Sequence, residues 1–179
     1  MHIIFEKITS DLSPHFSSFH ERYIHDFPEV ERREIATVIE LLHDANSPFT
    51  LEAILLEGQF VGFISYWKLP DFIYLEHFAI HPHKRSHGVG RNVLNLIKER
   101  YSEDKMLLEA EPPIAEIPLR RIRFYQRMGF KLSDIPYIQP PYRKGGDTCP
   151  LKIMTLRFGR EVRSEDLEII KRYAYQIEP

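Results

Sequence analysis

The stretch that decides the fold of this chain runs from residue 75 to residue 91 and reads Leu75-Glu76-His77-Phe78-Ala79-Ile80-His81-Pro82-His83-Lys84-Arg85-Ser86-His87-Gly88-Val89-Gly90-Arg91. Its first half is rich in aromatic and aliphatic residues, which is typical of a β-strand that ends at His81-Pro82. Its second half is a short basic turn with two glycines, after which apolar residues recur at helical spacing. A strand, a turn and a helix in this order bring free backbone amides and the positive end of a helix together, which favours an anion such as a diphosphate.

The two glycines allow more than one interpretation when they are taken alone. Gly88 and Gly90 would let the backbone approach phosphate oxygens, with Lys84 and Arg85 supplying charge at the rim. The same pattern suits an ordinary strand-to-helix turn that uses glycine for positive φ. A nucleotide-binding P-loop is disfavoured because Gly90 is followed by Arg91-Asn92 rather than by lysine and a hydroxyl residue.

Periodicity outside this stretch predicts alternating strands and helices. The spacing predicts strands over 2–8, 51–57, 60–67, 72–80, 105–111 and 151–158, and helices over 28–43, from 89 onward, over 116–128 and from a cap at Ser164. Gly58-Gln59 predicts a hairpin between the second and third strands. The segment from residue 135 to residue 150 carries four prolines and is the expected substrate loop. These elements suit an α/β fold in a single domain over residues 1–179.

Composition excludes several classes of function. The 179 residues carry a net charge of −2 without a basic stripe, so we expect neither nucleic acid nor a membrane as a partner. The amino terminus does not read as a signal peptide, which favours a cytoplasmic location. Cys149 is the only cysteine, and a structural thiol is favoured over an acyl-carrying nucleophile. We expect no metal at His81, His83 and His87, because they overlap the turn and lack nearby acidic or cysteine ligands.

A resemblance to a known family appears when two further segments are considered. Arg85 to Gly90 is similar to the Arg/Gln-x-x-Gly-x-Gly/Ala coenzyme A loop of the GNAT acetyltransferases, and Leu75 to Pro82 resembles the strand that leads into that loop. Phe124-Tyr125-Gln126-Arg127-Met128-Gly129-Phe130 resembles the family's Phe-Tyr-x-x-x-Gly-Phe segment. The resemblance implies a mixed, mostly antiparallel central sheet flanked by helices, with a splayed central strand pair.

The same resemblance implies a site for acetyl-coenzyme A as cosubstrate, without a metal. It places the pantetheine arm on the backbone of Phe78, Ala79 and Ile80. It places the pyrophosphate on the turn formed by Arg85, Ser86, His87, Gly88, Val89, Gly90 and Arg91.

Glu76 and Tyr125 are the candidate catalytic residues. By the two-residue period of a strand, Glu76 shares a face with Tyr74, Phe78 and Ile80, where partial burial would raise its pKa and suit a general base. A salt-bridged strand residue is the alternative. Tyr125 matches the position from which family members protonate the departing thiolate, and its alternative role is that of a core aromatic.

Four further residues are candidates for binding the acceptor. Glu109 and Glu111 alternate along a strand, so both carboxylates are expected on one side, where they could attract a cationic amine. Tyr137 and Tyr142 belong to the expected substrate loop. The resemblance implies N-acetyl transfer to a small-molecule or protein amine in a ternary complex, with a homodimer left open. A non-catalytic acyl-coenzyme A sensor on the same fold is the alternative function.

Overall fold

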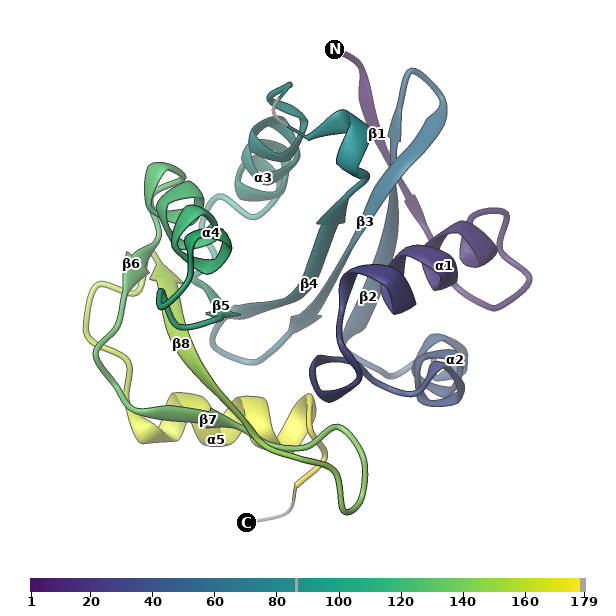
Figure 1. Cartoon of the computed structure of the whole chain (residues 1–179). Coiled ribbons are helices and arrows are strands. Elements are labelled where there is room, and N and C mark those ends of the chain that lie inside the picture. The colour runs from purple at the N-terminus through teal and green to yellow at the C-terminus, as the bar shows by residue number, and fades with distance from the viewer. Residues whose placement is uncertain (86, 178–179) are drawn as a thin grey trace.

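The computed structural model describes residues 1–85 and 87–177, and it contains one sheet with helices on both faces (Figure 1). The strand order is β1-β2-β3-β4-β5-β8-β6, and β7 pairs with β8. All pairs are antiparallel except β4 with β5. This is the mixed, mostly antiparallel α/β fold that the sequence predicts. The elements are β1 (Ile3–Lys7), α1 (Phe16–Asp26), η1 (Glu29–Glu31), α2 (Ile35–His43), β2 (Phe49–Leu56), β3 (Gln59–Lys68), β4 (Ile73–Ile80), η2 (Pro82–Lys84), α3 (Val89–Arg100), β5 (Met106–Ala110), α4 (Glu116–Arg127), β6 (Lys131–Leu132), β7 (Tyr137–Gln139), β8 (Cys149–Leu156) and α5 (Ser164–Tyr173).

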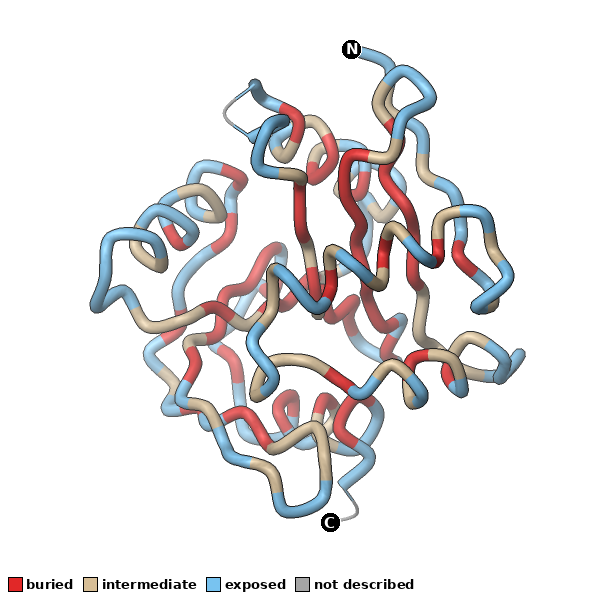
Figure 2. The backbone as a smooth tube through the Cα atoms, turned by 45° about the vertical axis from the view of Figure 1, so that its right-hand side comes forward, coloured by how far each residue is buried: buried red, intermediate tan, exposed pale blue. Residues whose placement is uncertain are grey.

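Helices cover the two faces of the sheet with separate apolar cores. Buried residues of α3 and α4 pack on one face, among them Val93, Ile97 and Ile122. Buried residues of α1 and α2, such as Phe19 and Val38, cover β2 and β3 on the other face, and α5 covers β5 and β8. The central strands are accordingly buried along much of their length (Figure 2). None of the helices in the described residues is both long and apolar enough to span a bilayer.

The hairpin between β2 and β3 confirms the predicted antiparallel pair, with its turn one residue earlier than expected. Glu57 has φ 51° and Gly58 has φ 79°, while Gln59 already belongs to β3. Two consecutive residues with positive φ give the turn a twist that matches the twist of the flanking strands. Leu56 lies opposite Gln59, and the register shifts by one residue between Leu55, opposite Phe60, and Ile54, opposite Gly62.

The helix predicted over residues 28–43 is wrong in its first part. Residues 29–31 form the short 3-10 helix η1, and Arg32 is extended with φ −140° and ψ 151°; α2 begins only at Ile35. The periodicity in this window did not show that Arg33 leaves the helical path to reach the protein interior, where its residue exposure is 3%. Helix α1, over residues 16–26, was not predicted.

The last helix begins close to the predicted position, but its cap differs. Ser164 is the first residue of α5, and Arg163 occupies the N-cap. The Asp166 carboxylate accepts a hydrogen bond from the Arg163 backbone amide at 2.9 Å and binds the Arg160 guanidinium at 2.7 and 2.8 Å. The acidic side chain thus reaches back to the amide of the N-cap residue, whereas a serine N-cap would accept a hydrogen bond from an amide within the first turn of the helix.

A bulge and a splay occur together at the middle of β4. Ser65 pairs with His77 and Tyr66 pairs with Leu75, so Glu76 is an extra residue in β4. On the other side β4 pairs with β5 only through residues 73–75 and 106–108. Glu76 and Glu109 are thus the first residues after the last β4–β5 pair. The two strands separate at the point where each carries a carboxylate.

Candidate functional site

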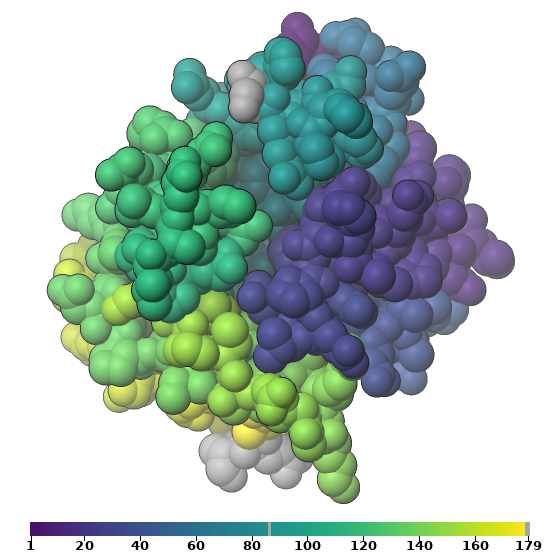
Figure 3. Space-filling model, in the orientation of Figure 1, coloured from purple at the N-terminus to yellow at the C-terminus, as the bar shows by residue number. Residues whose placement is uncertain are grey.

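The surface is hollowed over β4 between α1 on one side and α3 and α4 on the other (Figure 3). Glu76 lies at this splay with a side chain that is only 1% exposed, although the residue as a whole is half-buried. The exposed part of Glu76 is therefore its main chain. Phe78 is half-buried and packs with the α3 and α4 core, whereas Ala79 packs with the α1 core. Ile80, the last residue of β4, is buried.

The glycine turn leads directly into α3, as the sequence predicts. Gly88 is the N-cap residue with φ 77°, a left-handed conformation that glycine adopts without strain, and Val89 begins the helix as a buried anchor. Gly90 lies in the first turn of the helix, where an added Cβ would be 3.6 Å from the Phe124 ring. Arg91 is exposed. Ser86, which was expected in this turn, lies outside the described residues.

The Arg85 side chain makes contacts within the protein that its position in the sequence did not suggest. Its Nε donates to the carbonyl of Ile80 at 2.7 Å, and its guanidinium lies 3.6 Å from the Asp26 carboxylate at the end of α1. The His87 Nδ1 donates to the Arg85 carbonyl at 2.7 Å. These contacts fix the basic turn against the end of β4 and against α1.

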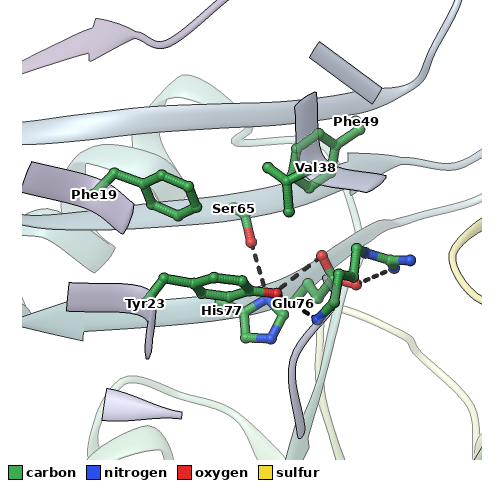
Figure 4. Close-up of a pocket in the computed structure, with 8 residues that line it drawn as sticks. Phe19, Tyr23, Val38, Phe49, Ser65, Glu76 and His77 are labelled. Carbon is green, nitrogen blue, oxygen red and sulfur yellow. Dashed lines mark hydrogen bonds and ion pairs between the residues drawn. The ribbon is translucent and has the colours of Figure 1, made fainter. Parts of the chain in front are cut away.

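The buried carboxylate of Glu76 forms an ion pair with Arg33. The Arg33 guanidinium donates to Glu76 Oε1, and the Tyr142 hydroxyl donates to the same oxygen at 3.2 Å. Glu76 Oε2 lies 3.5 Å from Nδ1 of His77, which also lies 3.3 Å from the Ser65 hydroxyl (Figure 4). Tyr23 packs edge-on against the His77 ring with centroids 5.0 Å apart. These groups enclose a space too small for a water molecule.

The pKa expected for Glu76 is therefore wrong in direction. Burial by itself would raise the pKa, but the charge of Arg33 and the contact with His77 outweigh burial and hold the pKa at about 2. The bulge also overturns the prediction that Glu76 shares a face with Phe78 and Ile80. Glu76 shares its face with Tyr74, while Phe78 and Ile80 pack with the opposite core. The alternation of side chains fails wherever a strand carries an extra residue.

Glu109 has the pKa that had been expected of Glu76. The residue is half-buried, and its carboxylate accepts hydrogen bonds from the Tyr137 hydroxyl and, at 2.9 Å, from the Tyr175 hydroxyl. Burial raises the pKa to about 7, although the hydrogen bonds from tyrosines favour the charged form. The nearby charge of Glu76 raises the pKa further. A carboxylate with this pKa exchanges protons near neutral pH.

Glu111 and Glu109 do not act as one pair. β5 ends at Ala110, so the strand alternation does not extend to Glu111, whose carboxylate binds Arg121 of α4. Glu111 contributes to raising the pKa of Glu31, after burial. Burial and the charges of Glu31, Glu111 and Glu109 also raise the pKa of Cys149. The rim of the site is therefore acidic, and the thiol stays protonated.

Tyr125 lies on α4 with a half-buried ring. The ring packs against Phe124 and Phe130, with centroids 5.3 and 5.8 Å away. In residues 1–85 and 87–177 no hydrogen bond to its hydroxyl is formed. Burial raises its pKa to about 12 against the lowering effect of Arg121, so the hydroxyl keeps its proton at neutral pH.

The structure brings the two predicted loop tyrosines to the two carboxylates. Tyr137 binds Glu109 and Tyr142 binds Glu76. Two residues that the sequence did not single out complete the cluster: Arg33 before α2 and Tyr175 after α5. A lone arginine and a tyrosine at a helix end carry no motif, so only the fold brings them here.

The described residues contain no group of three histidine, cysteine or acidic side chains arranged for a metal ion. His81 and His83 instead stack with their ring centroids 5.2 Å apart.

Comparisons with known proteins agree with this geometry. The sequence profile of the acetyltransferase (GNAT) family matches residues 9–130. A protein of the GNAT acetyltransferase family from Bacteroides thetaiotaomicron is 33% identical, with a TM-score of 0.85 over 98% of this chain and 99% of that chain. No curated protein matches the chain.

More distant solved structures share the fold. A protein from Arabidopsis thaliana in complex with a bisubstrate analogue is 14% identical, with a TM-score of 0.63 over 88% of this chain and 100% of that chain. A GNAT family acetyltransferase from Elizabethkingia anophelis, solved with acetyl-CoA bound, is 12% identical, with a TM-score of 0.56 over 89% of this chain and 98% of that chain.

Proposed function

This chain belongs to the GNAT family of acetyltransferases, and we propose that it transfers an acetyl group from acetyl-coenzyme A directly to a primary amine, with Glu109 as the base. Family membership implies the acetyl-coenzyme A-dependent acyl transfer. The amine acceptor, the ternary complex and the residue roles are the proposal. The observation that carries it is the pair of carboxylates at the splay, whose environments move their pKa values in opposite directions.

The residues around the splay suit acetyl-coenzyme A. The exposed main chain at Glu76 and the following residues 78–80 would hold the pantetheine arm by backbone contacts. The amides at the start of α3, with the left-handed Gly88 before them, point into the turn where the helix dipole favours a diphosphate. Arg85 and Arg91 place positive charge beside that turn. The bound molecule supplies the acetyl thioester.

Glu109 is better suited than Glu76 to accept the proton of the amine. A base with a pKa near 7 is largely ionised at physiological pH yet still takes a proton, whereas a carboxylate with a pKa of about 2 does so poorly. Glu76 is in addition paired with the full positive charge of Arg33, whereas Glu109 accepts hydrogen bonds from the neutral tyrosine hydroxyls of Tyr137 and Tyr175. The salt-bridged alternative therefore describes Glu76, and the role of base moves across the splay to Glu109.

The transfer then needs one proton acceptor and one proton donor. Glu109 removes a proton from the acceptor ammonium, and the freed amine nitrogen attacks the thioester carbonyl. The carbon–nitrogen bond forms and the carbon–sulfur bond breaks. Tyr125 donates its hydroxyl proton to the leaving sulfur, the second amine proton returns through solvent to the Tyr125 phenolate, and Glu109 releases the first amine proton to solvent. The products are an acetamide and free coenzyme A.

The acceptor that this site favours carries positive charge. Glu31, Glu109 and Glu111 lie close enough to act on one another or on Cys149, and Arg121 is the cation paired with Glu111. An ammonium group entering between these carboxylates would be attracted over several ångströms, most strongly at low ionic strength.

A thiol-release assay with a panel of amines tests the proposal. With amines that stay cationic throughout the pH range, kcat/KM should rise with pH around the Glu109 pKa of about 7. Glu109→Gln should reduce kcat/KM by roughly 10²-fold and remove this rise. If no amine releases thiol above the hydrolysis background while acetyl-coenzyme A still stabilises the fold, the chain is a binding module and the proposal fails. Full activity in Glu109→Gln would assign the base elsewhere.

A further inference from the structure

Arg33 connects three distant parts of the molecule from a buried position. Its side chain is 4% exposed and lies between η1 and α2. The guanidinium donates to Glu76 Oε1 on β4 and, at 2.6 Å, to the carbonyl of Ala174 after α5. Its central carbon lies 4.7 Å from the ring centroid of Tyr142 and 5.1 Å from that of Trp67. Both hydrogen bonds come from the same nitrogen, Nη2, so what lysine could not reproduce is the packing of the planar guanidinium against the two aromatic rings.

We propose that Arg33 is a positioning residue for acetyl transfer, which fixes Glu76, Tyr142 and the chain before Tyr175 so that the environment of Glu109 stays constant. This inference rests on the proposed role of Glu109 as the base.

The hydrogen bonds from Arg33 lead to Glu109 by two short routes. Arg33 binds the carbonyl of Ala174, and the next residue, Tyr175, donates to Glu109 Oε2 at 2.9 Å. Arg33 also binds Glu76, which accepts from the Tyr142 hydroxyl; that hydroxyl lies 3.3 Å from the hydroxyl of Tyr175. Both routes converge on Tyr175, so removal of the guanidinium would release this tyrosine from two sides.

Arg33 also balances the negative charge of Glu76, which lies near the proposed base Glu109. Glu76 and Arg33 together are neutral, and burial without a partner would make either charge costly. The titratable groups around Glu109 are Tyr74 and Glu76 of β4, Tyr137 of β7, Tyr142, Tyr175, Cys149 of β8, and the rim carboxylates Glu31 and Glu111. The tyrosines and the thiol are neutral at pH 7, because each has its pKa raised by burial. Glu76 of the Arg33–Glu76 pair is a charged group that acts on the pKa of Glu109.

Three variants separate the charge effect from the geometric effect. Glu76→Gln leaves the positive charge of Arg33 unbalanced, so the midpoint of the kcat/KM profile should move down by about one pH unit. The double variant Arg33→Met with Glu76→Gln removes this lone charge, so the midpoint should rise again from the Glu76→Gln value, and the release of Tyr175, whose hydrogen bond lowers the Glu109 pKa, should raise it further. Arg33→Lys keeps the charge and the midpoint but loses the packing of the guanidinium against Tyr142 and Trp67, so kcat should fall roughly tenfold or more.

Arg100 provides a matched control in the same molecule. Its guanidinium binds the buried carboxylate of Glu52 at 2.9 and 2.7 Å, on the side of the sheet that α3 covers. Arg100→Lys should lower the free energy of unfolding while leaving the midpoint and kcat unchanged. The double variant contains no lone buried charge, so it keeps the experiment informative if a single Arg33 variant does not fold.

A measurement without turnover separates this inference from the proposed function. The carboxyl resonance of Glu109, assigned by its loss in Glu109→Gln, can be titrated in protein with carbon-13-labelled glutamate. Its midpoint should fall in Glu76→Gln and rise again in the double variant. If the wild type acetylates amines but no variant changes the midpoint or kcat, Arg33 has only a structural role and the inference is overturned. If the midpoints move while no amine is acetylated, the proposed function fails and the coupling stands.

Discussion

At the scale of single residues, opposite environments separate the two carboxylates at the splay. Glu76 and Glu109 follow the same last pair of β4 and β5, yet Glu76 meets a guanidinium and Glu109 meets neutral tyrosine hydroxyls. A full positive charge stabilises a carboxylate more than neutral hydrogen bonds do, so burial prevails only at Glu109. The chemistry of the site therefore depends on which partner each carboxylate has.

Tyr125 allows a test at this scale. Tyr125→Phe should reduce kcat roughly 10²-fold, because the phenol proposed to protonate the sulfur is lost while the ring remains. The free energy of unfolding should change by less than about 0.5 kcal/mol, since the hydroxyl makes no hydrogen bond within the described residues. Steady-state thiol release and urea unfolding measure the two quantities. Unchanged thiol release across pH would remove Tyr125 from the mechanism.

At the scale of elements, β4 is held along the edge away from the splay by its close approach to β3. Gly62 lies opposite Ile80, and an added Cβ would be 2.1 Å from the Ala79 carbonyl oxygen and 3.1 Å from the Ile80 Cα. These are backbone atoms, so no side chain can rotate away. The separation of β3 and β4 at Gly62 fixes the position of β4, and any shift of β4 would also change its separation from β5 beyond Leu75.

Gly62→Ala should therefore destabilise the protein by roughly 1–3 kcal/mol, because β4 has to move. It should also raise the KM for acetyl-coenzyme A, since the same shift changes the splay. Gly90→Ala is the matched control for stability, because its added Cβ would meet only side chains at 3.6 Å or more. Urea unfolding of both variants makes the comparison. Equal stability of the two would show that the β3–β4 contact tolerates a methyl group.

The elements around the glycine turn could be predicted from sequence, whereas the segment before α2 could not. The β2–β3 hairpin, β4, α3 and α4 follow local periodicity and turn residues, which act over a few positions. Residues 28–34 show helical spacing but instead form η1 and an extended segment, because Arg33 reaches a carboxylate 43 positions away. Local patterns contain no information about a partner at that distance.

At the scale of the whole molecule, the Arg33–Glu76 pair joins the amino-terminal segment, the central sheet and the chain after α5. Gln139 adds a bond from β7 to the Val30 carbonyl at 3.0 Å, and Arg143 pairs with Glu29. These contacts join the segment around η1 to β7 and to the loop that follows it. The contribution of the Arg33–Glu76 pair to the free energy of unfolding should depend on the ionisation of Glu76.

The stability of the protein in acid tests this dependence. The pKa of Glu76 is lowered from 4.5 to about 2, so its contribution is present above pH 4.5 and is lost as the pH falls toward 2. The loss amounts to about 3 kcal/mol of unfolding free energy at most. Urea unfolding between these pH values should show this decline in the wild type and not in the double variant of Arg33→Met with Glu76→Gln. An equal decline in both would assign the acid sensitivity to other groups.

The sequence by itself determined the α/β fold class and the strand-turn-helix that begins α3, because alternating patterns and glycines act between near neighbours. It also singled out candidate site residues, namely Glu76, Glu109, Tyr125, Tyr137 and Tyr142. Only the tertiary structure decided which partner each carboxylate has and in which direction its pKa moves. Arg33 and Tyr175 come from 43 and 66 positions away, and the low-dielectric interior that they share with Glu76 and Glu109 sets the pKa of each.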